Sequence, residues 1–352
     1  MAEVIQRNEF EEEDAFPLYE TDQSGILSST RAVLEEGEHV WIDRERLDQL
    51  ALQWVQRMPQ EENGAALYTP VWYDNYHFHD GTERTVNWLL LLDALNFCFW
   101  AEKGQPRWQI EYKSELLNGY WAEAAALTRA VEEGIPLWDA AYLSNMSSDD
   151  IAHIFRGVPD SPPIPLVEQR LQNAHEVGQV LIAQYDGQFS HAIEQVEGDA
   201  VKLASLLATH FTSFNDIALY RKYEVRFLKR AQICVADIHG SFRGKKWGAL
   251  HNLDSLTAFA DYKLPQVLRH LGVLEYERTL AGCIDNQELI PQGSEEEIEI
   301  RAATIWACEL LRRAIAGHDC TMTAAEIDQR LWLLGQESTH MQPYHRTRTI
   351  FY

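Results

Sequence analysis

The sequence predicts a mostly α-helical protein with a small β element. Apolar residues recur at three- and four-residue spacings through most of the 352 residues, which is the pattern of helices that bury one face. Only one segment, residues 108–112 (WQIEY), alternates as a strand does. Hydrophobic residues make up 46% of the chain, enough to form a sizeable core. The fold class therefore rests on helical periodicity with one short exception.

In the first half of the chain, helices are predicted on both sides of this strand. Over residues 43–58, Leu47, Leu50 and Val55 share one face, and Asp43 is suited to cap the first turn. Residues 82–97 read as a largely buried helix. Residues 120–133 form another, which Gly134 and Pro136 should end.

In the second half, the run SPPIP at residues 161–165 is the clearest linker. Helices are predicted after it over residues 166–184, 201–209, 225–238, 264–271, 295–316 and 324–334. We therefore expect an acidic leader over residues 1–25, an N-terminal lobe over 26–160 and a C-terminal helical lobe over 161–352. The two lobes should form one compact unit with the active site between them.

The charge of the chain limits its partners. It has 54 acidic and 30 basic residues, for a formal net charge of -24. So acidic a surface repels phosphate backbones, which argues against a duplex-binding face. A compact group of cations for one small phosphate is still compatible with it. We expect neither duplex nucleic acid nor a membrane as a partner, and a small phosphate-bearing molecule stays compatible with the charge.

The cysteines and the apolar runs indicate a cytoplasmic protein. The five cysteines are widely spaced without a CxxC pair, which favours free thiols over disulfides. Residues 1–13 are polar and acidic, without the apolar stretch of a signal peptide. The longest apolar run, residues 88–92, is far too short to cross a bilayer.

Several well-known motifs are missing from the sequence. It has no GxGxxG or GxxxxGK[ST] phosphate loop, no GxSxG and no HExxH. Asp74, His77, His79 and Asp80 form the only dense group of metal-ligand types, and a polar loop is the commoner meaning of such a group. We expect neither a metal nor an organic cofactor.

The most informative segment is residues 253–274, LDSLTAFADYKLPQVLRHLGVL. In it Asp261 follows small and apolar residues and precedes a helix. A carboxylate in this position commonly caps the helix, and this interpretation stays open. The passage also resembles the loop-to-helix segment of helix-hairpin-helix DNA glycosylases, in which an aspartate stands before an Arg-containing helix. That likeness suggests a catalytic role for Asp261.

A wider resemblance supports the catalytic role. Blocks of residues in one order along the chain resemble the queuosine salvage protein family, the queuosine 5′-phosphate N-glycosylase/hydrolases. They are residues 93–97 (DALNF), 119–121 (GYW), 133–136 (EGIP), 165–168 (PLVE), 229–233 (KRAQI), 259–262 (FADY), 299–301 (EIR) and 345–348 (HRTR). The resemblance implies hydrolysis of queuosine 5′-monophosphate to queuine and ribose 5-phosphate, for queuine salvage in tRNA modification. It also implies a fold similar to the helix-hairpin-helix DNA glycosylase architecture.

The implied substrate makes a particular chemical demand. A 7-deazaguanine base has carbon where other purines have N7, so the leaving base is not activated by protonation there. More of the catalysis must then come from stabilising the positive charge that develops on the sugar as the C1′–N bond breaks. A carboxylate in a dry pocket can do this and can also orient or deprotonate the attacking water. Asp261 is predicted to do both.

Candidate residues for the base follow from its shape and charge. Phe259 is a candidate to stack on the flat ring, and it is equally typical of an ordinary core. The queuine side chain carries a secondary ammonium, for which Asp93 and Asp328 are the candidate partners. Asp93 is also compatible with a buried role in the fold, and Asp328 with a solvated helix position. His77 and His79 are candidates to contact the base edge.

The 5′-phosphate needs cations or helix N-termini. The candidates are Lys222, Lys229, Arg230 and Lys263, basic residues on either side of Asp261 in the sequence. Three of them belong to a basic run over residues 221–230, for which a solvated helix face is the alternative interpretation.

Two other functions stay open at this point. A DNA or RNA base glycosylase would use the same Asp261 passage, but it would need a basic face, against which the net charge argues. A non-catalytic queuine carrier or sensor would use the same pocket without turnover.

Overall fold

The computed structural model describes residues 22–58, 75–337 and 340–352. The chain divides into two compact units. Unit 1 comprises residues 1–70, 216–229 and 252–348, and unit 2 comprises residues 71–215, 230–251 and 349–352. Each unit is therefore assembled from segments far apart in the sequence, and the units do not follow a linear division at residue 160. Most of the predicted leader, residues 1–21, lies outside the described residues.

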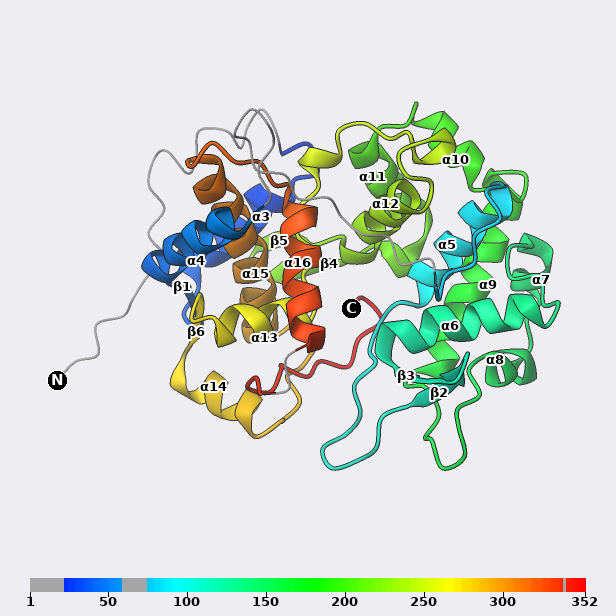
Figure 1. Cartoon of the computed structure of the whole chain (residues 1–352), viewed down its shortest axis with the longest axis horizontal. Coiled ribbons are helices and arrows are strands. Elements are labelled where there is room, and N and C mark those ends of the chain that lie inside the picture. The colour runs from blue at the N-terminus through cyan, green and yellow to red at the C-terminus, as the bar shows by residue number, and fades with distance from the viewer. Residues whose placement is uncertain (1–21, 59–74, 338–339) are drawn as a thin grey trace. The chain divides into compact units, whose positions relative to one another are not determined.

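Unit 1 is organised around one long helix, α15 (Glu295–Ala316), which contacts α3, α4, α13 and α16 (Figure 1). Ser294 caps α15 by accepting the Glu297 N–H at 3.3 Å, and three glutamates fill its first turn, where negative charge is favourable. The other helices of the unit are α3 (Ile26–Glu36), α4 (Arg44–Arg57), α13 (Lys263–His270), α14 (Arg278–Asp285) and α16 (Ala324–Glu337).

Two short antiparallel ladders complete unit 1. β1 (Val40–Ile42) pairs with β6 (Leu274–Tyr276), so that Val40 lies opposite Tyr276. β4 (Ile217–Tyr220) and β5 (Tyr223–Arg226) form a hairpin. Leu253–Ser255 is a 3₁₀ turn that leads into the irregular segment before α13.

Unit 2 contains the helix α5 (Glu83–Leu95), which is buried at every residue from Thr85 to Leu95. Its other helices are α6 (Gly119–Glu132), α7 (Ala140–Ser144), α8 (Ser148–Ile154), α9 (Val167–Gln184), α10 (Ser190–Gln195), α11 (Ala200–His210) and α12 (Lys229–Ser241), of which Lys229 itself belongs to unit 1. β2 (Gln109–Tyr112) and β3 (Glu115–Asn118) form its one hairpin among the described residues. Two further 3₁₀ turns are Thr212–Phe214 and Lys246–Gly248.

The buried end of α5 explains three polar residues of unit 2. The last carbonyls of a helix have no partner within the helix, and here water is excluded. Arg230 donates to the carbonyls of Asp93 and Ala94, Asn173 donates to that of Ala94 at 2.8 Å, and Arg170 donates to those of Leu95 and Phe97. These three side chains together supply the hydrogen bonds that the carbonyl groups at this end of α5 need.

The predicted fold class is confirmed: the chain is mostly helical with small antiparallel strand pairs. The strand predicted at residues 108–112 is β2, and Asp43 caps α4 by accepting the Arg46 N–H at 2.9 Å. The helix predicted over residues 295–316 has those bounds in the structure.

The helix predicted over residues 225–238 is wrong at its start, because Val225 lies in β5 opposite Ala218. The run of residues 221–230 is not one helix face either. It covers the hairpin turn, where Arg221 has φ 53°, then β5 and the first turn of α12. The helical spacing of the apolar residues after residue 229 led to a predicted start that is about one turn too early in the sequence.

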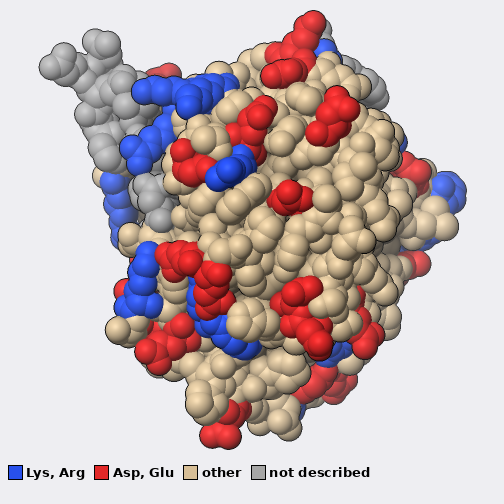
Figure 2. Space-filling model, turned by 90° about the vertical axis from the view of Figure 1, so that its right-hand side faces the viewer, with Lys and Arg blue, Asp and Glu red and all other residues tan. Residues whose placement is uncertain are grey.

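None of the helices in the described ranges combines the length and the apolar character needed to cross a membrane. Figure 2 shows the charge on one face: among the described residues, acidic side chains are scattered between uncharged ones, and Lys and Arg lie in separate groups. That face presents a mixed surface.

Candidate active site

The candidate site of unit 1 is built on residues 256–261, each of them buried. This segment has no regular structure, so its backbone polar groups need partners from elsewhere. The Phe259 N–H donates to Asp328 Oδ2 on α16 at 2.7 Å. The Ala260 carbonyl accepts from Arg301 Nε on α15 at 3.2 Å. Two side chains from two helices thus fix the backbone just before Asp261.

Asp261 lies at the N-terminal end of α13. Its Oδ1 accepts the N–H groups of Lys263 at 2.7 Å and Leu264 at 2.9 Å, as a capping residue does. The residue is 8% exposed, and its Oδ2 makes no hydrogen bond to the described residues. The capping interpretation is therefore met by one oxygen, and the second oxygen is not used in the cap.

Burial raises the pKa of Asp261, and nearby positive groups oppose this. The opposing groups are the Lys229 ammonium, the N–H groups of Leu264 and Lys263, and the Lys263 ammonium. The carboxylate therefore sits in a poorly solvated place but next to cations and a helix N-terminus, which favour its ionised form.

Asp328 is a second buried carboxyl in the same region. Burial, and after it the negative charge of Asp261, raises the pKa of Asp328 well above its ordinary value. The Phe259 N–H and Lys229 lower it only in part. Two neighbouring carboxyls with different surroundings separate their pKa values, so Asp261 ionises more readily than Asp328.

Lys229 and Lys263 both lie at this site, since the positive charge of each lowers the pKa of Asp261. Lys229 is 5% exposed, and its N–H donates to Asp216 Oδ2 at 3.2 Å. Lys263 Nζ donates to the Gly335 carbonyl on α16 at 3.2 Å, and the Tyr344 ring centre lies 5.6 Å away. Phe259, four positions before Lys263, is buried at 8% exposure.

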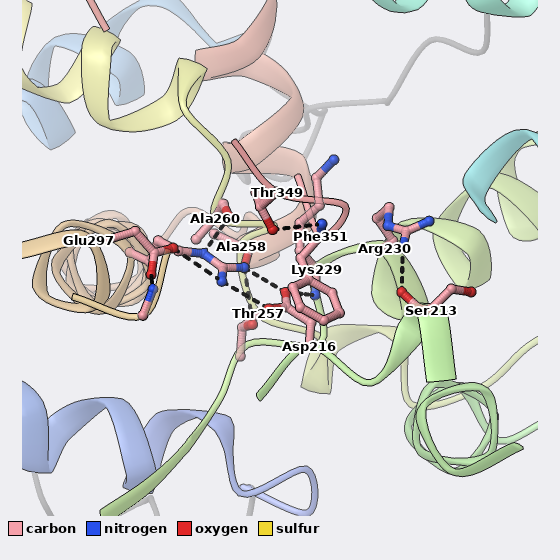
Figure 3. Close-up of polar contacts among 12 residues, drawn as sticks. Ser213, Asp216, Lys229, Arg230, Thr257, Ala258, Ala260, Glu297, Thr349 and Phe351 are labelled. Atoms are coloured by element: carbon pink, nitrogen blue, oxygen red, sulfur yellow. Dashed lines mark hydrogen bonds and ion pairs between the residues drawn. The ribbon is translucent and has the colours of Figure 1, made fainter. Parts of the chain in front are cut away.

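Two residues at the site were not singled out from the sequence, Asp216 and Arg301. Arg301 donates to both oxygens of Asp216, at 2.9 Å and 2.5 Å, and both side chains are 3% exposed. Asp216 and Lys229, which share a hydrogen bond, and Ala260, whose carbonyl accepts from Arg301, are labelled in Figure 3. The available signal was an arginine between Ile300 and Ala302, because a charge inside an apolar helix stretch is almost always paired.

Three of the residues predicted to bind the base lie in unit 2. His77 Nε2 is 2.8 Å from the Tyr120 hydroxyl, and the His77 ring packs edge-on against Trp88 and Trp121. Asp93 is fully buried on α5, and its charge contributes to raising the pKa of Tyr120, after burial and Asp237. His79 is exposed, with Nδ1 3.0 Å from Ser241 Oγ. Their predicted roles stay predictions.

The group of metal-ligand types near residue 77 is dispersed. His77 and His79 have the separate partners just described, and Asp80 accepts from Thr82 and Thr85. Asp74 lies outside the described residues. Within the described ranges, a group of three such residues with ligand atoms within 4.8 Å of one another occurs only at His39, Glu295 and Glu299.

The two carboxylates of that group already have partners within the fold. Glu299 Oε2 accepts the N–H groups of His39 at 2.7 Å and Glu38 at 3.1 Å. Its Oε1 accepts the Tyr220 hydroxyl at 2.9 Å. Glu295 is paired with Arg221 at 3.3 Å. The carboxylates therefore hold the strand β1 and the β4–β5 hairpin.

The other two predicted phosphate ligands have different surroundings. Lys222 lies at the tip of the β4–β5 hairpin, with Nζ 5.0 Å from the centre of the Tyr223 ring. Arg230 donates to backbone carbonyls of Asp93, Ala94 and Ser213 within unit 2. Their roles in binding phosphate stay predictions, and the contacts named here account for both side chains without a ligand.

Comparison with known proteins agrees with the resemblance read from the sequence. A family model described as "Queuosine salvage protein" matches residues 76–352. A protein of Sphaerobacter thermophilus named queuosine 5′-phosphate N-glycosylase/hydrolase is 46% identical over 332 residues, covering 94% of this chain and 98% of that protein. Proteins of the same name from Nematostella vectensis and Bos taurus are 38% and 34% identical, over 80% and 77% of this chain and 86% and 82% of their own lengths. The chain belongs to the queuosine salvage protein family.

Proposed function

We propose that this protein hydrolyses the N-glycosidic bond of queuosine 5′-monophosphate and releases queuine and ribose 5-phosphate for queuine salvage. The relatives carry the name queuosine 5′-phosphate N-glycosylase/hydrolase. The observation that carries the proposal is the buried Asp261 carboxylate, held by one oxygen at a helix N-terminus beside Lys229. Among the described residues, this is a carboxylate with one oxygen fixed and the other not hydrogen-bonded, as a glycoside-cleaving site needs.

In the proposed reaction, the C1′–N bond breaks and its electron pair goes to the base. Positive charge on the sugar is stabilised by the ionised Asp261, which is most effective where water is scarce. Water forms the new C1′–O bond and loses one proton to Asp261, and this proton then passes through solvent to the released base, so that the Asp261 carboxylate is restored. One water is consumed for each bond cleaved. No cofactor takes part in this scheme.

Asp328 is the proposed partner of the ammonium in the queuine side chain. Its proton is retained because burial and Asp261 disfavour a second negative charge. A bound ammonium would reverse that balance, so Asp328 would release its proton when the substrate enters. Phe259, on the same buried segment, is the proposed stacking residue for the base. Lys229 and Lys263 are the proposed cations for the 5′-phosphate.

The passage into α13 is the part of the fold that we compare with helix-hairpin-helix DNA glycosylases. An irregular buried segment ends at Asp261, and a short helix containing Arg269 follows. A free nucleotide is the proposed substrate, since a net charge of -24 disfavours a nucleic acid duplex. The five cysteines are free thiols, which supports a cytoplasmic location.

The test is chromatographic detection of queuine after mixing the protein with queuosine 5′-monophosphate or with the unphosphorylated nucleoside. We expect release from the phosphate, and faster than from the nucleoside. Asp261→Asn should lower kcat about 1,000-fold, because the amide keeps the capping hydrogen bonds but loses the negative charge. Asp254→Asn, a change at an exposed residue seven positions earlier, is the matched control and should keep full activity.

Two outcomes would contradict the proposal. Release by the Asp261→Asn variant at the parent rate would remove Asp261 from the chemistry. Binding without release by the parent protein would replace the hydrolase with a carrier or sensor.

A further inference from the structure

Arg301 is a buried cation of unit 1 with several polar partners. It lies in the N-terminal half of α15, and its Nη1 and Nη2 donate to the two oxygens of Asp216. Its Nε donates to the Ala260 carbonyl at 3.2 Å. The guanidinium carbon lies 3.9 Å from the centre of the Phe227 ring, which covers the pair on one side. Glu297, one turn earlier on α15, adds a second negative charge at 3.7 Å.

Asp216 uses its remaining acceptors on the segment that ends at Lys229. Its Oδ2 accepts the Lys229 N–H at 3.2 Å. Its backbone carbonyl accepts the N–H groups of Phe227 at 3.0 Å and Leu228 at 3.2 Å. Leu228 has φ 49°, a left-handed conformation that a branched residue adopts only when its surroundings impose it. Asp216 therefore dictates how the chain enters α12 at Lys229.

A continuous route of hydrogen bonds thus joins the backbone at Lys229 to the backbone next to Asp261. It runs from the Lys229 N–H to Asp216, from Asp216 to Arg301, and from Arg301 to the carbonyl directly before Asp261. The members come from three distant parts of the sequence. Asp216 and Arg301 stand 85 positions apart. Arg301 and Ala260 stand 41 apart.

Stability alone does not explain such a pair. A buried ion pair loses about as much through desolvation as it gains by attraction, so apolar residues of similar volume often serve a fold as well. What the pair adds is geometry, because an arginine fork bound to both carboxylate oxygens has one orientation. Here that orientation also fixes a third group, the Ala260 carbonyl.

We propose that Asp216 and Arg301 are positioning residues that hold Lys229 and Asp261 at a fixed separation in the active site. The inference rests on the proposed function of Asp261 and extends it to two residues that do not face the reacting atoms. The pair acts through the backbone, on Lys229 from one side and on Asp261 from the other. Asp328 adds a third hold on the same segment through Phe259.

The test compares Asp216→Asn with Glu309→Gln. Both changes replace a carboxylate that pairs with arginine on α15 by its amide, and Glu309 binds Arg312 and Arg313 instead. We expect Asp216→Asn to lower kcat/KM about 100-fold, as a small misplacement of reacting groups can do. Glu309→Gln should keep the parent kcat/KM. Unfolding by urea, measured on both, gives the loss of stability that must be matched.

A second readout separates positioning from mere loss of stability. The charged groups that face Asp261 are Lys229, Lys263 and Asp328. If Lys229 is released, it lowers the pKa of Asp261 less, so the acidic limb of the pH–rate profile moves to higher pH. The same rise should appear in a carbon-13 NMR titration of the Asp261 carboxyl, which does not depend on turnover. Glu309→Gln should change neither.

A parent-like pH profile and Asp261 titration in Asp216→Asn would overturn the inference. Arg301→Lys provides a second variant where Asp216→Asn does not fold, because it keeps the charge but lacks the fork. It should shift the titration in the same direction, and an unshifted titration again overturns the inference. Absence of turnover in the parent protein contradicts only the proposed function, since the NMR titration still tests the positioning of Asp261.

Discussion

Two buried arginines, one in each unit, show how the same side chain serves different ends. Arg170 of unit 2 pairs with Glu123 at 3.0 Å, with both side chains fully buried, and donates to carbonyls at the end of α5. Arg301 of unit 1 pairs with Asp216 and donates to the carbonyl before Asp261. Both use a charged fork to satisfy backbone oxygens away from water.

The difference lies in what the bound carbonyl belongs to. The carbonyls held by Arg170 end a helix, so the arginine completes secondary structure that would otherwise be unsatisfied. The carbonyl held by Arg301 belongs to an irregular segment whose next residue is ionisable. A buried cation therefore indicates function only when the segment that it holds leads to a reactive group.

The largest effect on stability is expected at Arg170. Arg170→Met leaves Glu123 and several carbonyls buried without their partner, which should cost about 3–5 kcal/mol of unfolding free energy. Urea unfolding measures it. Arg269→Met is the matched control, because its partner Asp285 is half exposed, and it should cost less than about 1 kcal/mol.

The comparison would fail if Arg170→Met shifted the pH profile of the folded enzyme as the Asp216 change does. Equal losses in Arg170→Met and Arg269→Met would show that burial does not set the contribution of the Glu123 pair.

A smaller effect, confined to activity, is expected at Lys229. The Lys229 ammonium lowers the pKa of Asp261, which burial raises. Asp261 must be ionised to act, so activity is lost as the pH falls through its pKa. Lys229→Met should therefore move the acidic limb of kcat/KM to higher pH. Lys222→Met, at the tip of the exposed hairpin, should leave the limb in place, and an equal shift in both would rule out a local effect.

The smallest effect is expected at Asp328. The contribution of this residue to stability decreases as the pH rises. The folded state raises the pKa of Asp328 above its ordinary value of 3.8, so the folded protein binds this proton more tightly than the unfolded chain. The contribution of Asp328 to stability is therefore present below the unfolded pKa and is lost as the pH rises. Asp328→Asn keeps an acceptor for the Phe259 N–H but does not titrate.

Asp328→Asn should therefore lose less stability than the parent between about pH 4 and about pH 7. Unfolding free energies at both pH values check this. Binding of queuosine 5′-monophosphate should weaken in the same variant if Asp328 meets the ammonium. A variant that loses stability with pH just as the parent does would place Asp328 outside the titrating groups.

Local patterns in the sequence were enough for most helices and for Asp261. The capping signal at Asp43 and the Glu-rich start of α15 act within one turn, so neighbouring residues reveal them. The capping position of Asp261 was found in the same way, whereas its catalytic role came from the family resemblance and stays a prediction. Phe259 and Lys263 were named through their closeness to Asp261, and the structure places them on the same passage.

The residues that were missed depend on contacts between distant segments. No local pattern pairs Asp216 with Arg301, which stand 85 positions apart. The β1–β6 ladder joins residues near 40 to residues near 275, so three apolar residues at each end gave no sign of a strand. Arg230 was predicted to bind phosphate from its closeness in sequence to Asp261; it donates to backbone carbonyls in unit 2, and its role in binding phosphate stays a prediction.

The interleaving of the two units also bears on how the protein is made. Unit 1 draws on residues 252–348, and unit 2 takes residues 349–352, where the Tyr352 carbonyl accepts the Cys98 N–H at 3.0 Å. Neither unit can therefore be finished on the ribosome before the last of these residues emerges. Contacts between such distant segments slow folding and leave apolar surface exposed meanwhile. Because each unit needs distant segments of the chain, the protein is better produced whole and with chaperones than as either half alone.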